Sequence, residues 1–170
     1  MTRAIAFVGM GSNLVHPRRQ LARAARRLAR LPRTTLVGLS RNFVTAPLGT
    51  HDVQPDYVNA VAMLCTALSP RALLARLNDL ERRQGRRRDV RGPPNAARPL
   101  DLDLLLYGRL RLDTRELKLP HPRMHERAFV LRPLADVARA ATIPGRGLAR
   151  RYLARVRDQR IAPTRSHHLH

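Results

Sequence analysis

The stretch RPLDLDLLLYG (residues 98–108) has the pattern of a buried β-strand. Residues 100–107 are too few and too apolar for an exposed helix, and a proline and a glycine bound them. Because alternate side chains of a strand share a face, Asp101 and Asp103 point one way and the leucines beside them point the other way. The stretch therefore predicts two carboxylates side by side at the start of a core strand.

Two neighbouring carboxylates in such a place repel each other and resist desolvation. A divalent cation relieves both problems, and oxygen ligands of this kind suit Mg²⁺ bound together with substrate phosphates. Arg98, just upstream, is placed to pair with a phosphate oxygen. For an isolated Asp-x-Asp, a solvated strand end paired with arginines is the commoner explanation. The other motifs of this chain favour the cation.

The length and composition predict a single globular domain. The chain has 170 residues, of which 44% are hydrophobic, so we expect one domain at residues 1–160 and a disordered tail at residues 161–170. Cys65, the only cysteine, lies in an apolar run and indicates a core residue in a reducing compartment. No segment has the pattern of a membrane span or a signal sequence. These features predict a cytoplasmic monomer with no membrane partner.

The chain is strongly basic, with a formal net charge of +21, and Lys118 is its only lysine. A field this positive attracts any polyanion, including nucleic acid and nucleotides. Proteins that stack on RNA bases usually carry aromatic side chains on the basic surface, whereas aromatics are 4% of this chain and tryptophan is absent. We therefore expect nucleic-acid binding to be non-specific at most.

The periodicity along the chain predicts an α+β fold. The expected elements are a strand at residues 4–8, a helix at 17–31, strands at 35–43 and 57–64, a helix at 70–85 and the strand at 100–107. This β-α-β-β-α-β order is that of the ferredoxin-like split β-α-β arrangement, an antiparallel sheet with helices packed on it. The same fold serves many functions.

Smaller features are expected around these elements. Gly9-Met10-Gly11 is predicted to be a tight turn, residues 109–112 a hairpin partner of the preceding strand, and residues 134–138 and 147–156 short helices. The long segment at residues 44–56 is a candidate binding loop. The basic, glycine- and proline-bearing segment at residues 85–97 is expected to be a mobile loop.

Several separated motifs resemble one family, 6-hydroxymethyl-7,8-dihydropterin pyrophosphokinase. They are Gly11-Ser12-Asn13-Leu14, Thr45-x-Pro47-Leu48-Gly49, Gln54-Pro55-Asp56-Tyr57-x-Asn59, Arg98-Pro99-Leu100-Asp101-Leu102-Asp103 and Leu119-Pro120-His121-Pro122-Arg123-Met124-x-x-Arg127-x-Phe129. The resemblance runs in order from about residue 4 to about residue 137. It implies transfer of the β,γ-diphosphate of ATP to the pterin hydroxymethyl group, with release of AMP, in folate biosynthesis.

The resemblance also implies roles for individual residues. It assigns two Mg²⁺ ions to Asp101 and Asp103, catalytic phosphate contacts to Arg86 and Arg98, and ATP contacts to Glu81, Arg88, His121 and Arg127. It assigns the pterin site to Thr45, Pro47, Leu48, Tyr57, Asn59 and Phe129. Two aromatic rings and an amide suit a flat, amide-rich ring system, although Tyr57 and Phe129 taken alone are better explained as core residues.

The chain departs from the family in places. Residues 93–97 stand where an aromatic and a basic residue are frequent, and Glu116 and Lys118 occupy positions of expected nucleotide contacts. These departures bear on the adenine and ribose contacts more than on the carboxylate pair. Two alternatives stay open at this stage: a basic nucleic-acid-binding module on the same fold, and a paralogue that binds pterin or nucleotide with little or no transfer.

Overall fold

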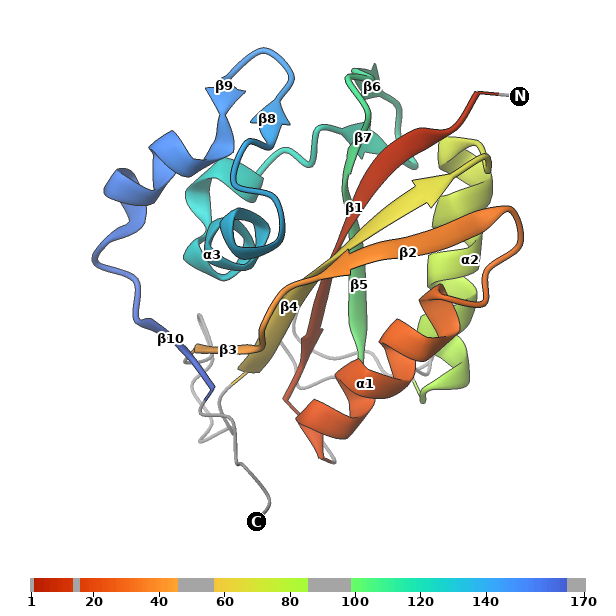
Figure 1. Cartoon of the computed structure of the whole chain (residues 1–170), viewed down its shortest axis with the longest axis horizontal. Helices are drawn as coiled ribbons and strands as arrows, with labels where there is room; N and C mark the ends of the chain where they lie inside the picture. The colour runs from red at the N-terminus through yellow and green to blue at the C-terminus, as the bar shows by residue number, and fades with distance from the viewer. Residues whose placement is uncertain (1, 14–15, 46–56, 86–98, 165–170) are drawn as a thin grey trace.

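The computed structural model describes residues 2–13, 16–45, 57–85 and 99–164 (Figure 1). An antiparallel sheet forms its centre, with strands in the order β10–β3–β4–β1–β5 and with β2 paired to β4. These strands are β1 (Ala4–Ser12), β2 (Thr34–Leu39), β3 (Phe43–Thr45), β4 (Tyr57–Thr66), β5 (Asp101–Tyr107) and β10 (Ile161–Pro163). The predicted α+β class and antiparallel sheet are confirmed.

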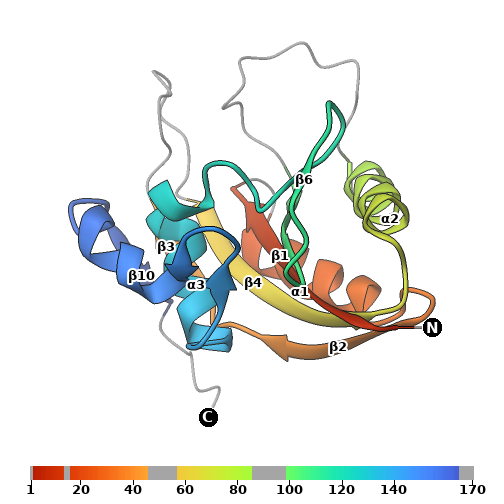
Figure 2. The same ribbon diagram turned by 90° about the horizontal axis from the view of Figure 1, so that it is seen from above.

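Helices cover both faces of this sheet (Figures 1 and 2). Helices α1 (Pro17–Leu28) and α2 (Pro70–Arg83) pack on one face, and α3 (Ala128–Val137) packs on the other. The 3₁₀ helices η1 (Met124–Glu126) and η2 (Ala149–Val156) accompany α3. Two small hairpins complete the described chain, β6 (Leu112–Asp113) with β7 (Lys118–Leu119), and β8 (Thr142–Ile143) with β9 (Gly147–Leu148).

The alternation along β1 divides the core into two layers. Ala6, Val8 and Met10 are buried against α1 and α2, whereas Phe7 is buried in the cluster beneath α3. This is the period of two that a strand imposes on its side chains. One face of the sheet is thus filled by α1 and α2, and the other face is shared between α3 and an open region.

Helices α1 and α2 form where the sequence predicts helices. In α1 the two leucines, Ala24 and Ala25 are buried while most of the arginines face solvent. In α2 the side chain of Ser69 accepts a hydrogen bond from the backbone N–H of Ala72 at 3.2 Å, and Pro70 takes the first helical position. Leu73, Leu77 and Leu80 are its buried residues, so helix capping and periodicity together fix this element.

Several local predictions are wrong. Gly9-Met10-Gly11 is part of β1 rather than a turn, and residues 109–112 do not return along β5, because Leu112 pairs with Leu119 instead. The strand expected at residues 35–43 is two strands, β2 and β3. Residues 134–138 are not a separate helix, since α3 continues through Pro133.

The expected disordered tail is also corrected at its start. Residues 161–163 form β10, in which Ile161 pairs with Thr45 at the edge of the sheet. The remainder of the expected tail, residues 165–170, lies outside the described residues. In the part of the chain that the structure describes, no helix has the length and apolar character needed to cross a membrane.

Candidate active site

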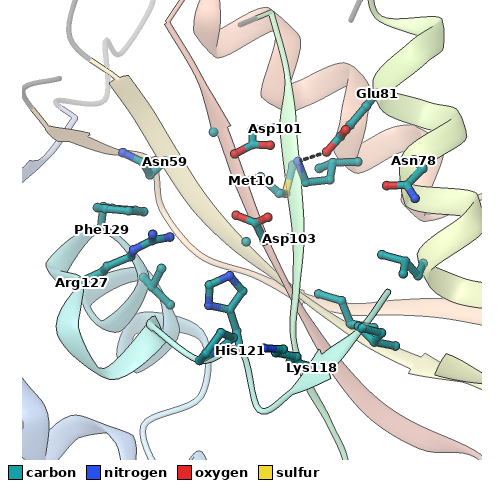
Figure 3. A pocket seen from close by; sticks show the side chains of 18 of the residues that line it. Met10, Asn59, Asn78, Glu81, Asp101, Asp103, Lys118, His121, Arg127 and Phe129 are labelled. Atoms are coloured by element: carbon teal, nitrogen blue, oxygen red, sulfur yellow. Dashed lines mark hydrogen bonds between the residues drawn. The ribbon is translucent and has the colours of Figure 1, made fainter. Parts of the chain in front are cut away.

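Asp101 and Asp103 project from β5 into the open region of the sheet face that α3 shares (Figure 3). The alternating Leu102 and Leu104 are 3% and 4% exposed and belong to the core beneath α1 and α2. The two carboxylates are half-buried, as expected for side chains that line a cavity. The same-face arrangement predicted from the spacing is therefore present.

The neighbouring strand presents glycine beside each carboxylate. In the antiparallel register of β1 and β5, Gly11 pairs with Asp101 and Gly9 pairs with Asp103. On its other side, Gly11 pairs with Asn59 of β4. Since directly paired residues lie on the same face of a sheet, Asn59, Gly11 and Asp101 form a row across three strands.

A cavity of about 560 Å³ lies over this row. Its walls come from β1, β3, β4, β5, α2, the β6–β7 hairpin and the start of α3. All nine described residues that the sequence analysis assigned to the site line this one cavity. They are Thr45, Tyr57, Asn59, Glu81, Asp101, Asp103, His121, Arg127 and Phe129.

The other five assigned residues lie outside the described part of the chain. They are Pro47, Leu48, Arg86, Arg88 and Arg98. The structure also places residues in the cavity wall that had been given no role there, among them Gly9, Gly11, Asn78 and Leu117. The signal for the two glycines is their period-two spacing within an apolar strand, a pattern that local rules assign to a turn.

One end of the cavity combines an amide with aromatic rings. The side-chain Nδ2 of Asn59 donates a hydrogen bond to Oγ1 of Thr45 at 2.9 Å, and these residues are 6% and 9% exposed. Tyr57 pairs with Thr45 across the strands and is half-buried. The guanidinium carbon of Arg127 lies 5.4 Å from the centre of the Phe129 ring. We call this end of the cavity, lined by Thr45, Tyr57, Asn59 and Phe129, the ring-binding end, because it can hold a flat ring with polar edges.

His121 brings a hydrogen-bond donor toward the carboxylates (Figure 3). Burial, with the positive charge of Arg127 as the next cause, lowers the pKa of His121 from 6.5 to about 4. The backbone N–H of Arg123 donates to Nδ1 of this imidazole at 3.2 Å. Because Nδ1 accepts, the neutral ring carries its proton on Nε2. The side chain is thus a neutral donor at neutral pH.

Glu81 is buried at the opposite side of the cavity, on α2 (Figure 3). Its Oε1 accepts a hydrogen bond from the backbone N–H of Leu102 at 2.8 Å. Leu102 lies between the two aspartates, so Glu81 connects α2 to the strand that carries them. The carboxylate lines the cavity and also supports its wall.

The donor set fits magnesium chemistry. Among the described residues, no group of three or more His, Cys, Asp and Glu side chains is arranged to hold a metal by itself. Mg²⁺ is commonly bound through one or two carboxylates together with substrate phosphates and water, rather than by an all-protein cage. Asp101 and Asp103 provide that number of carboxylates, with cationic side chains nearby for phosphate.

This fold and cavity define a class of protein, an antiparallel α+β domain whose carboxylate pair and nearby cationic side chains suit a small molecule that carries phosphate groups. A paired carboxylate site lies between a ring-binding end and the α2 side of the cavity (Figure 3). Residues 7–139 match the family 7,8-dihydro-6-hydroxymethylpterin-pyrophosphokinase (HPPK), and the chain belongs to this family. The resemblance drawn from the sequence motifs is confirmed.

Curated relatives agree over most of the chain. The chain is 49% identical over 138 residues to the 2-amino-4-hydroxy-6-hydroxymethyldihydropteridine pyrophosphokinase of Pseudomonas aeruginosa, covering 81% of this chain and 83% of the relative. It is 44% identical over 139 residues to the enzyme of the same name from Haemophilus influenzae, covering 82% and 84%.

Solved structures share the fold at low sequence identity. A Plasmodium falciparum HPPK-DHPS crystal structure with pteroate superposes with a TM-score of 0.66 at 12% identity, covering 93% of this chain and 44% of that chain. An HPPK-DHPS structure in complex with substrates gives a TM-score of 0.66 at 13% identity, covering 92% and 44%. The chain thus spans less than half of these longer proteins, and the likeness supports the fold.

Proposed function

We propose that the chain transfers diphosphate from ATP to the hydroxymethyl group of 6-hydroxymethyl-7,8-dihydropterin and releases AMP, in folate biosynthesis. The observation that carries this proposal is a single cavity in a member of the HPPK family that contains both a carboxylate pair and a ring-binding end. In the reaction, a bond forms between the hydroxymethyl oxygen and the β-phosphorus. The bond from that phosphorus to the bridging oxygen of AMP breaks, and the hydroxyl proton is released.

Asp101 and Asp103 would hold two Mg²⁺ ions together with the triphosphate. Mg²⁺ bound there supplies neutralisation of phosphate charge and orientation of the reacting groups. The two aspartates contribute negative oxygen ligands from a rigid strand whose backbone Glu81 supports. In this proposal Glu81 acts mainly through the strand, in addition to its expected place beside the nucleotide.

His121 and Arg127 would bind phosphate oxygens. His121 has a neutral Nε2–H donor, and Arg127 is a permanent cation that also lies over the Phe129 ring. Donors of both kinds stabilise charge that moves between the attacking and leaving oxygens. By resemblance alone, Arg86, Arg88 and Arg98 would add further phosphate contacts, with Arg86 and Arg98 acting in catalysis.

The ring-binding end would hold the pterin. Tyr57 and Phe129 supply aromatic faces, and Asn59 supplies an amide oriented by Thr45. The fixed orientation matters because the amide oxygen can only accept a hydrogen bond and the amide nitrogen can only donate one. The orientation therefore decides which polar edge of a ligand the amide can bind. By resemblance, Pro47 and Leu48 would complete this end of the site.

The proposal is tested by incubating the protein with ATP, Mg²⁺ and the reduced pterin, and separating nucleotides by chromatography. AMP is expected to form in equal amount to pterin diphosphate, and only when all three are present. Chelation with EDTA should stop the reaction, and readdition of Mg²⁺ should restore it. Absence of AMP above a protein-free control would overturn the proposal and leave the paralogue with little or no transfer, or the nucleic-acid-binding module.

A further inference from the structure

The backbone conformation at Gly11 does not require glycine. It lies inside β1, and its φ is not in the left-handed region that favours glycine. Within a strand, glycine weakens the element, and it often marks a place where a ligand or another backbone approaches closely. The explanation for Gly11 must therefore be found in the space that its missing side chain leaves.

A side chain at this position would collide with Asn59. A Cβ built on Gly11 would lie 3.1 Å from Oδ1 of Asn59, closer than ordinary van der Waals contact. The amide of Asn59 has little freedom to retreat, because its Nδ2 donates to Thr45 and the side chain is 6% exposed. A methyl group on Gly11 would thus push this amide by a few tenths of an ångström and strain its hydrogen bond to Thr45.

Gly9, two residues earlier on the same face, provides a contrast. A Cβ there would lie 3.4 Å from Cδ1 of Leu105, which is ordinary contact with the end of an apolar side chain. The two glycines share strand, face and residue type. Only Gly11 borders a polar group at the ring-binding end of the cavity.

Gly11 also lies midway between the two halves of the site. It pairs with Asn59 on one side and with Asp101 on the other. Neighbouring strands are about 4.8 Å apart, so the backbones of Asn59 and Asp101 are separated by roughly 10 Å with Gly11 between them. A substituent of the bound ring that reaches from the ring-binding end to the carboxylates must pass over this residue.

We propose that Gly11 is a specificity-determining residue for the pterin. Its missing side chain fixes the position of the Asn59 amide oxygen, and it leaves open the space through which the hydroxymethyl arm extends toward Asp101. This inference rests on the proposed function, because it takes the ring at Asn59 to be the pterin. It predicts that an added methyl disturbs pterin recognition and leaves ATP recognition largely intact.

The test compares Gly11→Ala with Gly9→Ala in steady-state assays of AMP formation. The Gly11 variant should raise the KM for pterin, or lower kcat/KM for pterin, by about 10-fold, because the Asn59 amide must move by a few tenths of an ångström and a misplacement of about 1 Å can cost about 100-fold. The KM for ATP should change far less. Gly9→Ala measures the effect of adding a methyl to the strand itself, and it should disturb pterin recognition much less.

A double-variant cycle with Asn59→Ala identifies the contact. Removing the Asn59 amide should itself weaken pterin, and adding Gly11→Ala should then cost little more, because the colliding group is gone. If Gly11→Ala alone fails to fold, the double variant should recover the Tm. Absence of that recovery, or additive effects on pterin, would overturn the proposal, as would equal effects of the two glycine variants.

The outcomes separate this inference from the proposed function. If the unaltered protein forms no AMP from ATP and pterin, the proposed function fails before any variant is compared. If the unaltered protein is active and Gly11→Ala behaves as Gly9→Ala does, only the role of Gly11 is refuted. A parallel loss of ATP and pterin recognition in Gly11→Ala would likewise refute specificity and indicate general damage to the site.

Discussion

The buried carboxylate of Glu81 accepts a hydrogen bond at 2.8 Å from the backbone N–H of Leu102, the residue between Asp101 and Asp103. Strand β5 is the last strand on its side of the sheet. An edge strand leaves backbone groups without a partner strand, and buried groups of this kind need another partner. Glu81 of helix α2 supplies such a partner to Leu102, between the two aspartates.

Glu81→Leu should therefore destabilise the protein more than Glu81→Gln. Leucine leaves a buried N–H without an acceptor, which costs about 1–3 kcal/mol, whereas the glutamine Oε1 can still accept. Urea unfolding measures this difference. If Glu81 positions the aspartates, Glu81→Leu should also raise the Mg²⁺ concentration that gives half-maximal rate. A loss of stability with an unchanged Mg²⁺ dependence would limit Glu81 to a structural role.

Asp101→Asn and Asp103→Asn should each abolish most diphosphate transfer while leaving the fold intact. Each change removes a charged ligand of the proposed ions, a loss of several kcal/mol that corresponds to roughly a thousandfold or more in rate. Rate measurements at saturating Mg²⁺ test the loss of diphosphate transfer, and thermal melting tests whether the fold is intact.

Asp113→Asn is the matched control for those variants. Asp113 lies on β6 with its side chain 89% exposed and does not line the cavity, and its carboxylate is 3.9 Å from the ammonium of Lys118, which does. Because an exposed ion pair of this length contributes little, the same chemical change removes a carboxylate from outside the cavity wall. Near-normal turnover in either Asp101→Asn or Asp103→Asn would contradict the metal assignment. A similar loss in Asp113→Asn would point to a general effect of charge.

Tyr57→Ala and Phe129→Ala should weaken pterin much more than ATP. Both side chains line the ring-binding end, and aromatic stacking contributes about 0.5–1.5 kcal/mol beyond the area that it buries. Comparison of the KM values for the two substrates tests the expectation. Equal loss of both affinities would indicate that these are core residues whose removal distorts the whole cavity.

Any affinity for nucleic acid should be electrostatic and independent of sequence. The exposed arginines of α1, Arg18, Arg19, Arg23 and Arg26, illustrate how positive charge is spread over solvent-facing surface. Binding that depends on phosphate contacts falls steeply as salt increases. Fluorescence anisotropy with two unrelated oligonucleotides across a salt series tests this. A preference for one sequence that persists at physiological salt would contradict it.

The sequence allowed prediction of those parts of the fold that depend on short-range rules. The spacing of Asp101 and Asp103 gave their common face, and the Ser69-Pro70 pair gave the start of α2. The two core layers follow from alternation in the strands. Five of the nine described site residues lie on strands β3, β4 and β5 of one sheet, and the other four are brought to the same cavity by α2, the segment after β7 and the start of α3.

The remaining features depend on contacts between distant segments. Glycine usually marks a turn, yet Gly9 and Gly11 stay in β1 because β4 and β5 pair with it on both sides. Residues 161–163 become a strand only because β3 offers an edge. The link from Glu81 to Leu102 spans 21 positions and leaves no local pattern. Such contacts require knowledge of the assembled sheet.

His121 should remain neutral well below the pH at which an ordinary histidine is protonated. Burial and Arg127 lower its pKa from 6.5 to about 4 in the folded protein. NMR titration of the free protein should show the His121 imidazole still neutral near pH 5.5. A midpoint near 6.5 would contradict the buried, neutral imidazole.

The same pKa difference predicts the direction of a stability change. Between the folded pKa of about 4 and the ordinary histidine pKa of 6.5, the unfolded chain binds more protons at this site than the folded protein does. The contribution of a neutral His121 is therefore fully present above pH 6.5 and is lost progressively as the pH falls toward 4. Relative to His121→Gln, which takes up no proton, the unaltered protein should lose free energy of unfolding from pH 7.5 to pH 4.5 in urea titrations. A difference between the two proteins that stays constant over this range would show that His121 titrates alike in both states.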